Sequence, residues 1–172
     1  FLPLQGPGYI VEAARLTAGS PVRWTLVGDG PEKPKCLALA KGLDNIVFKD
    51  HIAYKDLPSA IAGYDVVLGV FGDTEKAARV MPNKFFQALA CGQAVVTMRS
   101  RAYPAAVAES EAVKFVDPGN PRQLADAVLQ WCYDRSSLAS ATAQARRLFE
   151  CEFGSEVISS QVAGTLNEAL FR

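Results

Sequence analysis

The chain has 172 residues, which is room for one ordinary domain with a well-buried core. Hydrophobic residues make up 49% and charged residues 21%, a composition typical of globular proteins. The 18 basic and 18 acidic residues cancel. This balance argues against a general nucleic-acid binder, whose phosphate contacts need a basic excess, but it leaves room for one small basic pocket that takes a phosphorylated ligand.

Strand-type segments alternate with segments of helical periodicity along the chain. The predicted strands cover residues 22–27, 45–48, 65–70, 94–98 and 113–116. Predicted helices begin near residue 9, cover 32–41, 56–62, 82–91 and 105–109, and continue as three amphipathic stretches after residue 120. Because parallel strands are joined by right-handed helical crossovers, this order predicts a doubly wound parallel sheet with helices on both faces, a Rossmann-like α/β fold.

The start of the chain and its cysteines carry further expectations. A helix that begins after Gly6 should follow a strand, yet only a few residues precede it, so we expect a single domain, residues 1–172, cut from a longer protein. The four cysteines are scattered without a Cys-x-x-Cys pair, and the chain has one histidine. This pattern predicts reduced thiols in the cytoplasm and no zinc site. No apolar run approaches the roughly 20 residues that span a bilayer.

Ligands of doubly wound sheets bind outside the carboxyl ends of the strands, so the loops there are the candidate sites. Gly28 and Gly30 follow a predicted strand and precede a predicted helix. Glycines at such a turn allow close backbone approach to a ligand, and the helix start could hold a phosphate. A tight turn without any ligand is the alternative, because the segment lacks the complete dinucleotide-binding fingerprint.

The segment 71–84 is a long polar loop that runs into the start of the clearest predicted helix. The free N–H groups of Asn83 and Lys84, together with the helix dipole, suit a diphosphate. Lys76, Arg79 and Lys84 add positive charge, and arginine can hold phosphate oxygens bidentately. A solvated loop in which Asp73 and Glu75 pair with these bases is the alternative.

Two further polar residues need an interpretation. Gln87 lies one helical turn beyond Lys84 among apolar neighbours, which makes it a residue of the rim or a ligand contact. His51 lies in a loop after a short strand. It has no second histidine for a dyad, and the chain shows no nucleophile elbow and no identifiable pair of glycosidase carboxylates, so no catalytic residue is assigned.

The segment Pro-Asn-Lys-Phe-Phe-Gln-Ala-Leu-Ala-Cys-Gly at residues 82–92 resembles the signature of the retaining GT-B glycosyltransferases of family 4. Other segments resemble the same family in the same order. They are the first helix and its preceding turn (1–14), the Val-Gly-x-Gly-Pro-like loop (26–31), the Asp-Val-Val strand (65–68) and the stretch before a late helix (115–120). The resemblance covers essentially the whole chain but only the C-terminal, donor-binding half of such an enzyme.

This resemblance implies a domain that binds a nucleotide-diphosphate sugar, in an enzyme that transfers a hexosyl group with retention and needs no metal or other cofactor. It also implies donor-binding residues against the base, the ribose and the diphosphate. Two carboxylates of the family's Glu-(seven residues)-Glu motif are replaced, the first by Arg79 and the second by Gln87. The family's diphosphate-clamping lysine position appears as Gln5. The donor-binding candidates are Gly28, Gly30, His51, Ile52, Tyr54, Arg79, Pro82, Asn83, Lys84 and Gln87.

By the same resemblance, the acceptor and the usual catalytic histidine belong to an N-terminal domain that this chain lacks, so the isolated chain is expected to be inactive. We expect a cytoplasmic protein without nucleic-acid partners, and peripheral attachment to the inner face of the membrane stays open. Two alternatives remain. One is a noncatalytic, degenerate transferase-like binding module, which the Arg79 and Gln87 replacements favour slightly, and the other is a GT-B sugar-nucleotide epimerase domain.

Overall fold

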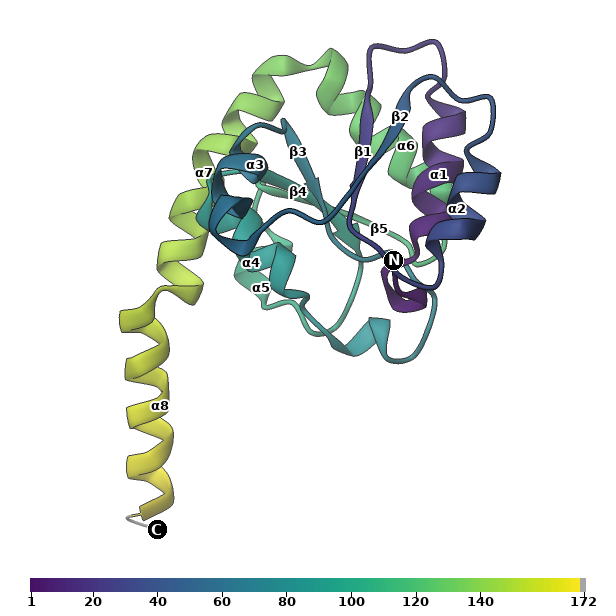
Figure 1. The fold of residues 1–172 in the computed structure, drawn as a ribbon. Helices are drawn as coiled ribbons and strands as arrows, with labels where there is room; N and C mark the ends of the chain where they lie inside the picture. The colour runs from purple at the N-terminus through teal and green to yellow at the C-terminus, as the bar shows by residue number, and fades with distance from the viewer. Residues whose placement is uncertain (171–172) are drawn as a thin grey trace.

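The computed structural model describes residues 1–170, and helices cover both faces of its parallel β-sheets (Figure 1). The strands are β1 (Trp24–Val27), β2 (Ile46–Lys49), β3 (Val66–Leu68), β4 (Ala94–Met98) and β5 (Val113–Val116). The helices are α1 (Pro7–Leu16), α2 (Lys33–Leu39), α3 (Leu57–Ala62), α4 (Asn83–Ala90), α5 (Ala105–Ala108), α6 (Pro121–Tyr133), α7 (Arg135–Phe153) and α8 (Ser155–Leu170). Three 3₁₀ turns complete the set: η1 (Pro3–Gln5), η2 (Tyr54–Asp56) and η3 (Ala77–Arg79).

All strand pairs are parallel, which confirms the predicted α/β fold class. Hydrogen bonds divide the described strands into two sheets, one of order β1-β2 and one of order β3-β4-β5. Within residues 1–170, β1 therefore pairs only with β2, and β3 pairs only with β4. In this described part of the chain, one edge of β1 and one edge of β3 are left without a partner strand.

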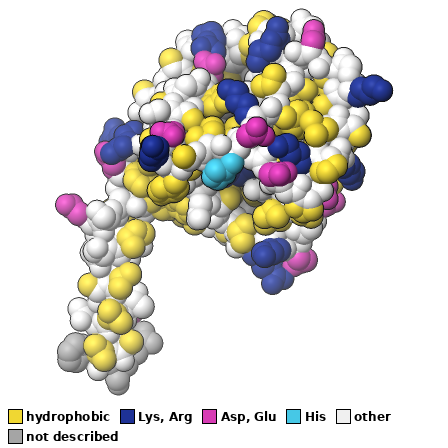
Figure 2. All heavy atoms as spheres, viewed as in Figure 1, with side chains coloured by type: hydrophobic (Ala, Val, Ile, Leu, Met, Phe, Trp, Pro, Cys, Tyr) yellow, Lys and Arg dark blue, Asp and Glu magenta, His cyan; other side chains and the backbone are white. Residues whose placement is uncertain are grey.

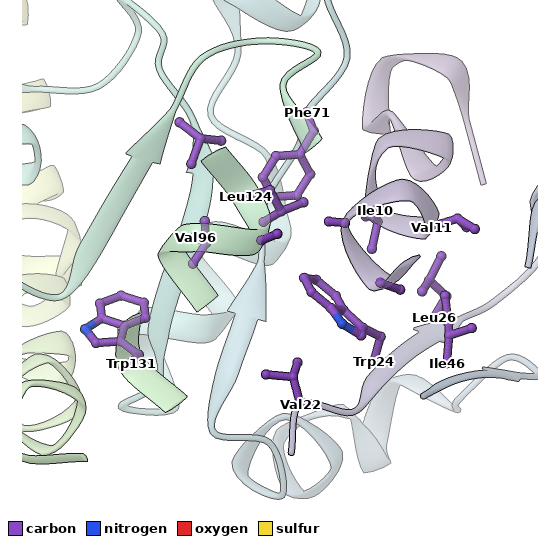
Figure 3. Close-up of a cluster of buried hydrophobic side chains, with 14 of the residues drawn as sticks. Ile10, Val11, Val22, Trp24, Leu26, Ile46, Phe71, Val96, Leu124 and Trp131 are labelled. Atoms are coloured by element: carbon purple, nitrogen blue, oxygen red, sulfur yellow. The ribbon is translucent and has the colours of Figure 1, made fainter. Parts of the chain in front are cut away.

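Strand β4 lies at the centre of the larger sheet, and all five of its residues are buried. Its apolar run is typical of a strand that is covered on both faces. Ala94 and Val96 pack into a cluster with residues of α1 and α6, whereas Val95 packs on the opposite face with residues of α4 and α7. The first cluster also takes in residues of β1 and β2, so one core spans both sheets (Figure 3).

The ends of the elements follow local rules that the sequence shows. Asn120 caps α6, because its side-chain oxygen accepts a hydrogen bond from the Gln123 backbone N–H at 3.0 Å, as predicted. Gly92 follows α4 with a φ of 73°, in the left-handed region that favours glycine, which also confirms its predicted place. Pro82 is the N-cap residue of α4 rather than its first helical residue, so this helix is shorter than the predicted 82–91.

The last helix, α8, extends away from the rest of the fold (Figure 1). Every residue in its second half is exposed, including Val162, Leu166 and Leu170. Within the described residues, no helix combines the length and the apolar character that crossing a membrane requires.

A buried hydrogen-bond network joins α1 to β1 and predicts the effect of one substitution. Thr17 Oγ1 accepts a hydrogen bond from Trp24 Nε1 at 2.8 Å and lies 3.3 Å from Asn45 Nδ2. We expect Thr17→Val to lower the free energy of unfolding by about 1–3 kcal/mol, because it leaves a buried indole N–H without a partner. Urea denaturation measures this effect.

The matched control is Thr165→Val on the exposed helix α8. Thr165 Oγ1 donates a hydrogen bond to the Gln161 backbone carbonyl at 2.9 Å, and this hydrogen bond is exposed to water. We expect a change within about 0.5 kcal/mol. Equal effects of the two substitutions would contradict the role assigned to the network.

Candidate functional site

The carboxyl ends of β1 and β3 lie at the same edge of the molecule, because the first residues of the chain bridge them. The Phe1 amino group donates to Asp29 O at 2.8 Å, just after β1. The backbone N–H of Phe71, just after β3, donates to Gln5 O at 3.1 Å. Because ligands of such folds bind outside the carboxyl ends of the strands, this edge is the candidate site.

A cavity of about 800 Å³ opens at this edge and runs between the two sheets. Three of the predicted donor-binding residues line it: Ile52, Lys84 and Gln87. Gln5 lines it as well. The structure thus brings together residues that follow β2, residues at the start of α4 and a residue of η1.

The first half of α4 supplies two polar side chains to this cavity. Phe85 and Leu89 are buried against the core and fix the orientation of the helix. Lys84 and Gln87 then lie on the side that faces the cavity. Pro82, the N-cap residue, has no N–H and makes no side-chain cap, so the helix start has no capping side chain of its own.

Lys84 is the only lysine whose side chain lines the cavity within residues 1–170, and it makes no ion pair with a carboxylate there. Burial alone lowers the pKa of Lys84 to about 8. The charged form is therefore destabilised by loss of water, and an anion at this position would restore a favourable partner. A lysine with this environment at a helix start is suited to bind a diphosphate.

The glycines after β1 have a structural role that the sequence did not reveal. Gly30 has a φ of 148°, and a Cβ atom there would lie 2.7 Å from the backbone oxygen of Phe1. Gly28 has a φ of 107° with open space around it. Neither glycine lines the cavity, and Gly30 is needed for the close approach of Phe1.

The loop after β2 places one side chain in the cavity and others at the surface. Ile52 is partly buried and lines the cavity, whereas His51 and Tyr54 are exposed and do not line it. Tyr54 is 79% exposed in η2. Of the three residues predicted to lie against a base, Ile52 is therefore the one that lines the cavity.

Arg79 does not join Lys84 in the cavity. Its guanidinium pairs with Glu75 across one turn at 2.5 Å, and both side chains are exposed. Lys76 is exposed too. The pairing alternative that the sequence left open is therefore what the structure shows for Arg79, while Lys84 alone of these three bases lines the cavity. On the face seen in Figure 2, basic and acidic side chains are interspersed rather than gathered by sign.

The segment between β3 and α4 is held in place more firmly than a solvated loop would be. Phe71 is 1% exposed and belongs to the core. Tyr9 OH donates to Asp73 Oδ2 at 3.1 Å, and burial, with a smaller effect of this carboxylate, raises the pKa of Tyr9. Ser100 Oγ donates to Ala78 O at 2.8 Å. These contacts fix the position from which α4 begins.

The cavity also contains residues that the sequence analysis missed. Tyr64 lines it, and Lys49 Nζ lies 5.8 Å from the centre of its ring. The sequence contained one signal for Tyr64, which is its position as an aromatic residue directly before the predicted strand 65–70. Within residues 1–170, no three His, Cys, Asp or Glu side chains are grouped to hold a metal ion.

Comparison with known proteins identifies the family. The model of the group 1 glycosyl transferases matches residues 2–134, more than half of the chain. The chain belongs to this family of glycosyl transferases. A search of curated proteins finds no match.

Solved structures with the same fold include chains that are longer than this one. Anabaena Alr3699/HepE, in complex with UDP-glucose, matches with a TM-score of 0.77 and 20% identity over 98% of this chain and 46% of its own. Sucrose-phosphate synthase from Thermosynechococcus elongatus matches with a TM-score of 0.74 and 22% identity over 97% and 42%. The chain thus spans less than half the length of these two proteins.

A third structure matches over most of both chains. It is the C-terminal domain of LpcC, a group 1 family glycosyl transferase from Francisella tularensis, with a TM-score of 0.74 and 22% identity over 90% of this chain and 83% of its own. The fold is accordingly that of the C-terminal domain of GT-B glycosyltransferases.

The buried charge of Lys84 predicts how stability depends on pH. The folded protein binds a proton at Lys84 with a pKa of about 8, whereas the unfolded chain has the ordinary value of 10.5. Between these two pH values the unfolded state binds more protons, so the free energy of unfolding rises with pH. Below pH about 8 both states are protonated and the full cost of the buried charge remains.

We therefore expect Lys84→Met to raise the free energy of unfolding at pH 7 by about 1–3 kcal/mol and to reduce its rise between pH 8 and 10.5. Burial also lowers the pKa of Lys114 to about 8, so Lys114 contributes to the rise in the free energy of unfolding that remains in this variant. Urea denaturation across this pH range measures both effects. Lys55→Met, at an exposed position, controls for the loss of one positive charge, and an equal gain in that variant would contradict the interpretation.

Proposed function

We propose that the chain is the donor-binding domain of a retaining glycosyltransferase of family 4. The domain binds a nucleotide-diphosphate sugar, and the full-length enzyme transfers the hexosyl group to an acceptor held by a second, N-terminal domain. The isolated chain binds the donor but does not turn it over. The enzyme is cytoplasmic and needs no metal, and any peripheral attachment to the inner face of the membrane is a property of the other domain.

The observation that carries this proposal is Lys84, which lines the cavity at the start of α4; its ammonium group is shielded from water and has no ion-pair partner in the described chain. Backbone N–H groups at a helix start and a nearby ammonium group bind phosphate oxygens, with the helix dipole adding to the attraction. The family membership, and the UDP and UDP-glucose complexes of HepE, support a nucleotide sugar as the anion at this position.

The chemistry follows from where charge develops in the reaction. When the sugar leaves, negative charge grows on the diphosphate, and donors that are already oriented there stabilise the transition state most. In this proposal the N–H groups of Asn83 and Lys84 and the Lys84 ammonium group bind that diphosphate. Gln87, one turn later on the same side, can donate to and accept from ribose hydroxyls. Ile52 contributes an apolar surface for the base.

Arg79 distinguishes the main proposal from a noncatalytic binding module. An arginine cannot accept a hydroxyl hydrogen bond from a sugar, but it suits phosphate or an acidic sugar once it is released from Glu75. Exposed ion pairs are worth only about 0–1 kcal/mol, so a bound anion can separate this one. A module without a donor site would make no use of such an exchange.

The proposal is tested by calorimetric titration of the chain with UDP, GDP and their sugars. We expect at least one nucleoside diphosphate to bind with a dissociation constant in the micromolar to millimolar range. Absence of binding by all of them, in a chain whose circular dichroism shows it to be folded, would overturn the proposal.

Substitution of Lys84 gives the first prediction for binding. We expect Lys84→Met to weaken binding of the nucleoside diphosphate about tenfold or more, because a charge-assisted hydrogen bond to phosphate is lost. For the wild type, affinity should fall as the pH rises through about 8, since the anion binds the protonated form of Lys84. Calorimetry at pH 6.5 and 9 measures the loss of affinity in the variant and the pH dependence of the wild-type affinity.

The matched control is Arg147→Met, which removes an exposed positive charge from α7, outside the cavity. This variant should keep the affinity and the pH dependence of the wild type. A Lys84→Met variant that binds as tightly as this control would show that the diphosphate lies elsewhere.

Substitution of Glu75 gives the second prediction for binding. We expect Glu75→Gln to strengthen diphosphate binding by about two- to fivefold, because Arg79 no longer has a carboxylate partner. The double variant Glu75→Gln with Arg79→Gln should lose that gain. If Glu75→Gln leaves the titration unchanged, Arg79 takes no part in binding the donor.

A further inference from the structure

The loop between β3 and α4 leads to the candidate site but has little regular structure of its own. It leaves β3 after Leu68 and enters α4 at Asn83, with the short turn η3 between them. Fixing a loop of this length costs conformational entropy, which contacts with the rest of the fold must offset. The segment that follows β4 supplies such contacts at the start, in the middle and at the end of the loop.

The first contact is made at the start of the loop by the buried side chain of Thr97 in β4. Thr97 is 0% exposed, and the Val70 backbone N–H donates to its Oγ1 at 3.4 Å. Gly69 makes this approach possible, because a Cβ atom there would lie 2.2 Å from Thr97 Oγ1. The hydroxyl of Tyr103 shares a hydrogen bond with the same oxygen at 3.1 Å. Tyr103 is thereby linked to the point at which the chain leaves β3.

The second contact holds the middle of the loop. Ser100 Oγ donates to Ala78 O in η3 at 2.8 Å and accepts from the Ala102 backbone N–H at 3.1 Å. The segment that contains Ser100 is itself attached to β5, because the Arg99 backbone N–H donates to Val116 O at 2.7 Å. The loop between β3 and α4 therefore rests on a neighbour whose own position is fixed.

The third contact is aromatic and lies at the end of the loop. The rings of Tyr103 and Phe85 meet edge to face, with ring centres 4.9 Å apart and planes inclined by 61°. Both residues are buried. Aromatic pairs in this arrangement gain more than the burial of their area alone provides. Because Phe85 directly follows Lys84, the Tyr103 ring holds the residue next to the ammonium-bearing side chain of the candidate site.

Tyr103 takes part in both the first and the third contact. Its hydroxyl reaches the start of the loop through Thr97, and its ring reaches the end of the loop at Phe85. The ring also packs against Phe115 of β5, with ring centres 5.0 Å apart. Tyr103 does not line the cavity. It can therefore influence the site only through the residues that it holds.

We propose that Tyr103 is a positioning residue for the donor diphosphate, because it holds the first turn of α4, and with it Lys84, at the carboxyl end of β3. It acts through Phe85 and does not touch the donor. The inference rests on the proposed function, since it names a residue that supports binding at the same site. Misplacement of a binding group by about 1 Å is enough to lose much of its effect.

Calorimetric titration with UDP and GDP tests this role in two variants of Tyr103. Tyr103→Leu removes the ring contact with Phe85 and should weaken binding about tenfold or more. Tyr103→Phe keeps the ring and loses only the hydrogen bond to Thr97, so it should retain most of the affinity, with a loss of about two- to fivefold.

The matched control is Phe115→Leu, which removes a ring from the same buried cluster. Phe115 packs against Tyr103, and no ring contact between Phe115 and Phe85 is found in the described chain. Urea denaturation should show that Phe115→Leu and Tyr103→Leu both lower the free energy of unfolding. Phe115→Leu should nevertheless bind within about twofold of the wild type, because Phe85 keeps its contact with Tyr103.

The ionisation of Lys84 gives a second readout that needs no ligand. NMR of the chain labelled with ¹³C at the lysine Cε atoms follows this ionisation, and Lys84→Met assigns the signal. Burial, without a contribution from any charged group of the described chain, lowers the pKa of Lys84 to about 8. In Tyr103→Leu we expect a pKa closer to the ordinary 10.5, because a displaced helix start admits water. In Phe115→Leu the pKa of Lys84 should stay at about 8.

The outcomes separate this role from the proposed function. If neither UDP nor GDP binds to the folded wild type, the proposed function is overturned. An equal loss of affinity in Tyr103→Leu and Phe115→Leu, or an equal pKa of Lys84 in these two variants, overturns the role of Tyr103 alone. If Tyr103→Leu does not fold, wild-type affinity in Tyr103→Phe overturns it.

Discussion

The packing of α1 against α6 is the contact on which the rest of this structure depends. The two sheets share no strand pair within the described residues, so side-chain packing rather than a hydrogen-bonded ladder holds them together. Trp24 from β1, Ile10 from α1 and Leu124 from α6 belong to one buried cluster that also includes Val96 of β4 (Figure 3). The candidate site combines Ile52, which follows β2, with Lys84, which follows β3. Its geometry therefore depends on that cluster.

Lys84 shows how a charged side chain is kept in apolar surroundings at the expense of stability. A methionine at this position would suit the apolar surroundings better, since burial disfavours the ammonium group. The protein retains a charged group there without a carboxylate to neutralise it in the described chain. Arg79 is the opposite case, because Glu75 already neutralises it at the surface. Two bases only a few residues apart thus differ in whether a carboxylate neutralises them.

Much of the fold was predictable from residue patterns. Periodicity located β4 and β5 with the bounds that the structure has, and Asn120-Pro121 correctly marked the start of α6. The site was predictable in part. Lys84 and Gln87 both line the cavity. Lys84 was a candidate because a local rule links a helix N-terminus to anions, and Gln87 because it is a polar residue among apolar neighbours. The exposed positions of His51 and Tyr54, and the pairing of Arg79 with Glu75, depend on how loops pack, which no local pattern encodes. The role of Gly30 likewise depends on Phe1, which is distant in sequence.

The positions of the aromatic residues have one more consequence. Both tryptophans of the chain, Trp24 and Trp131, are buried and both line the cavity between the two sheets. The ammonium group of Lys114 lies 4.3 Å from the centre of the Trp131 ring, and no such cation contact is found for Trp24 in the described chain. The two indoles therefore sit in electrically different surroundings beside the same space. The two tryptophans are intrinsic fluorophores, so the fluorescence of the protein is sensitive to whatever enters the space between the two sheets.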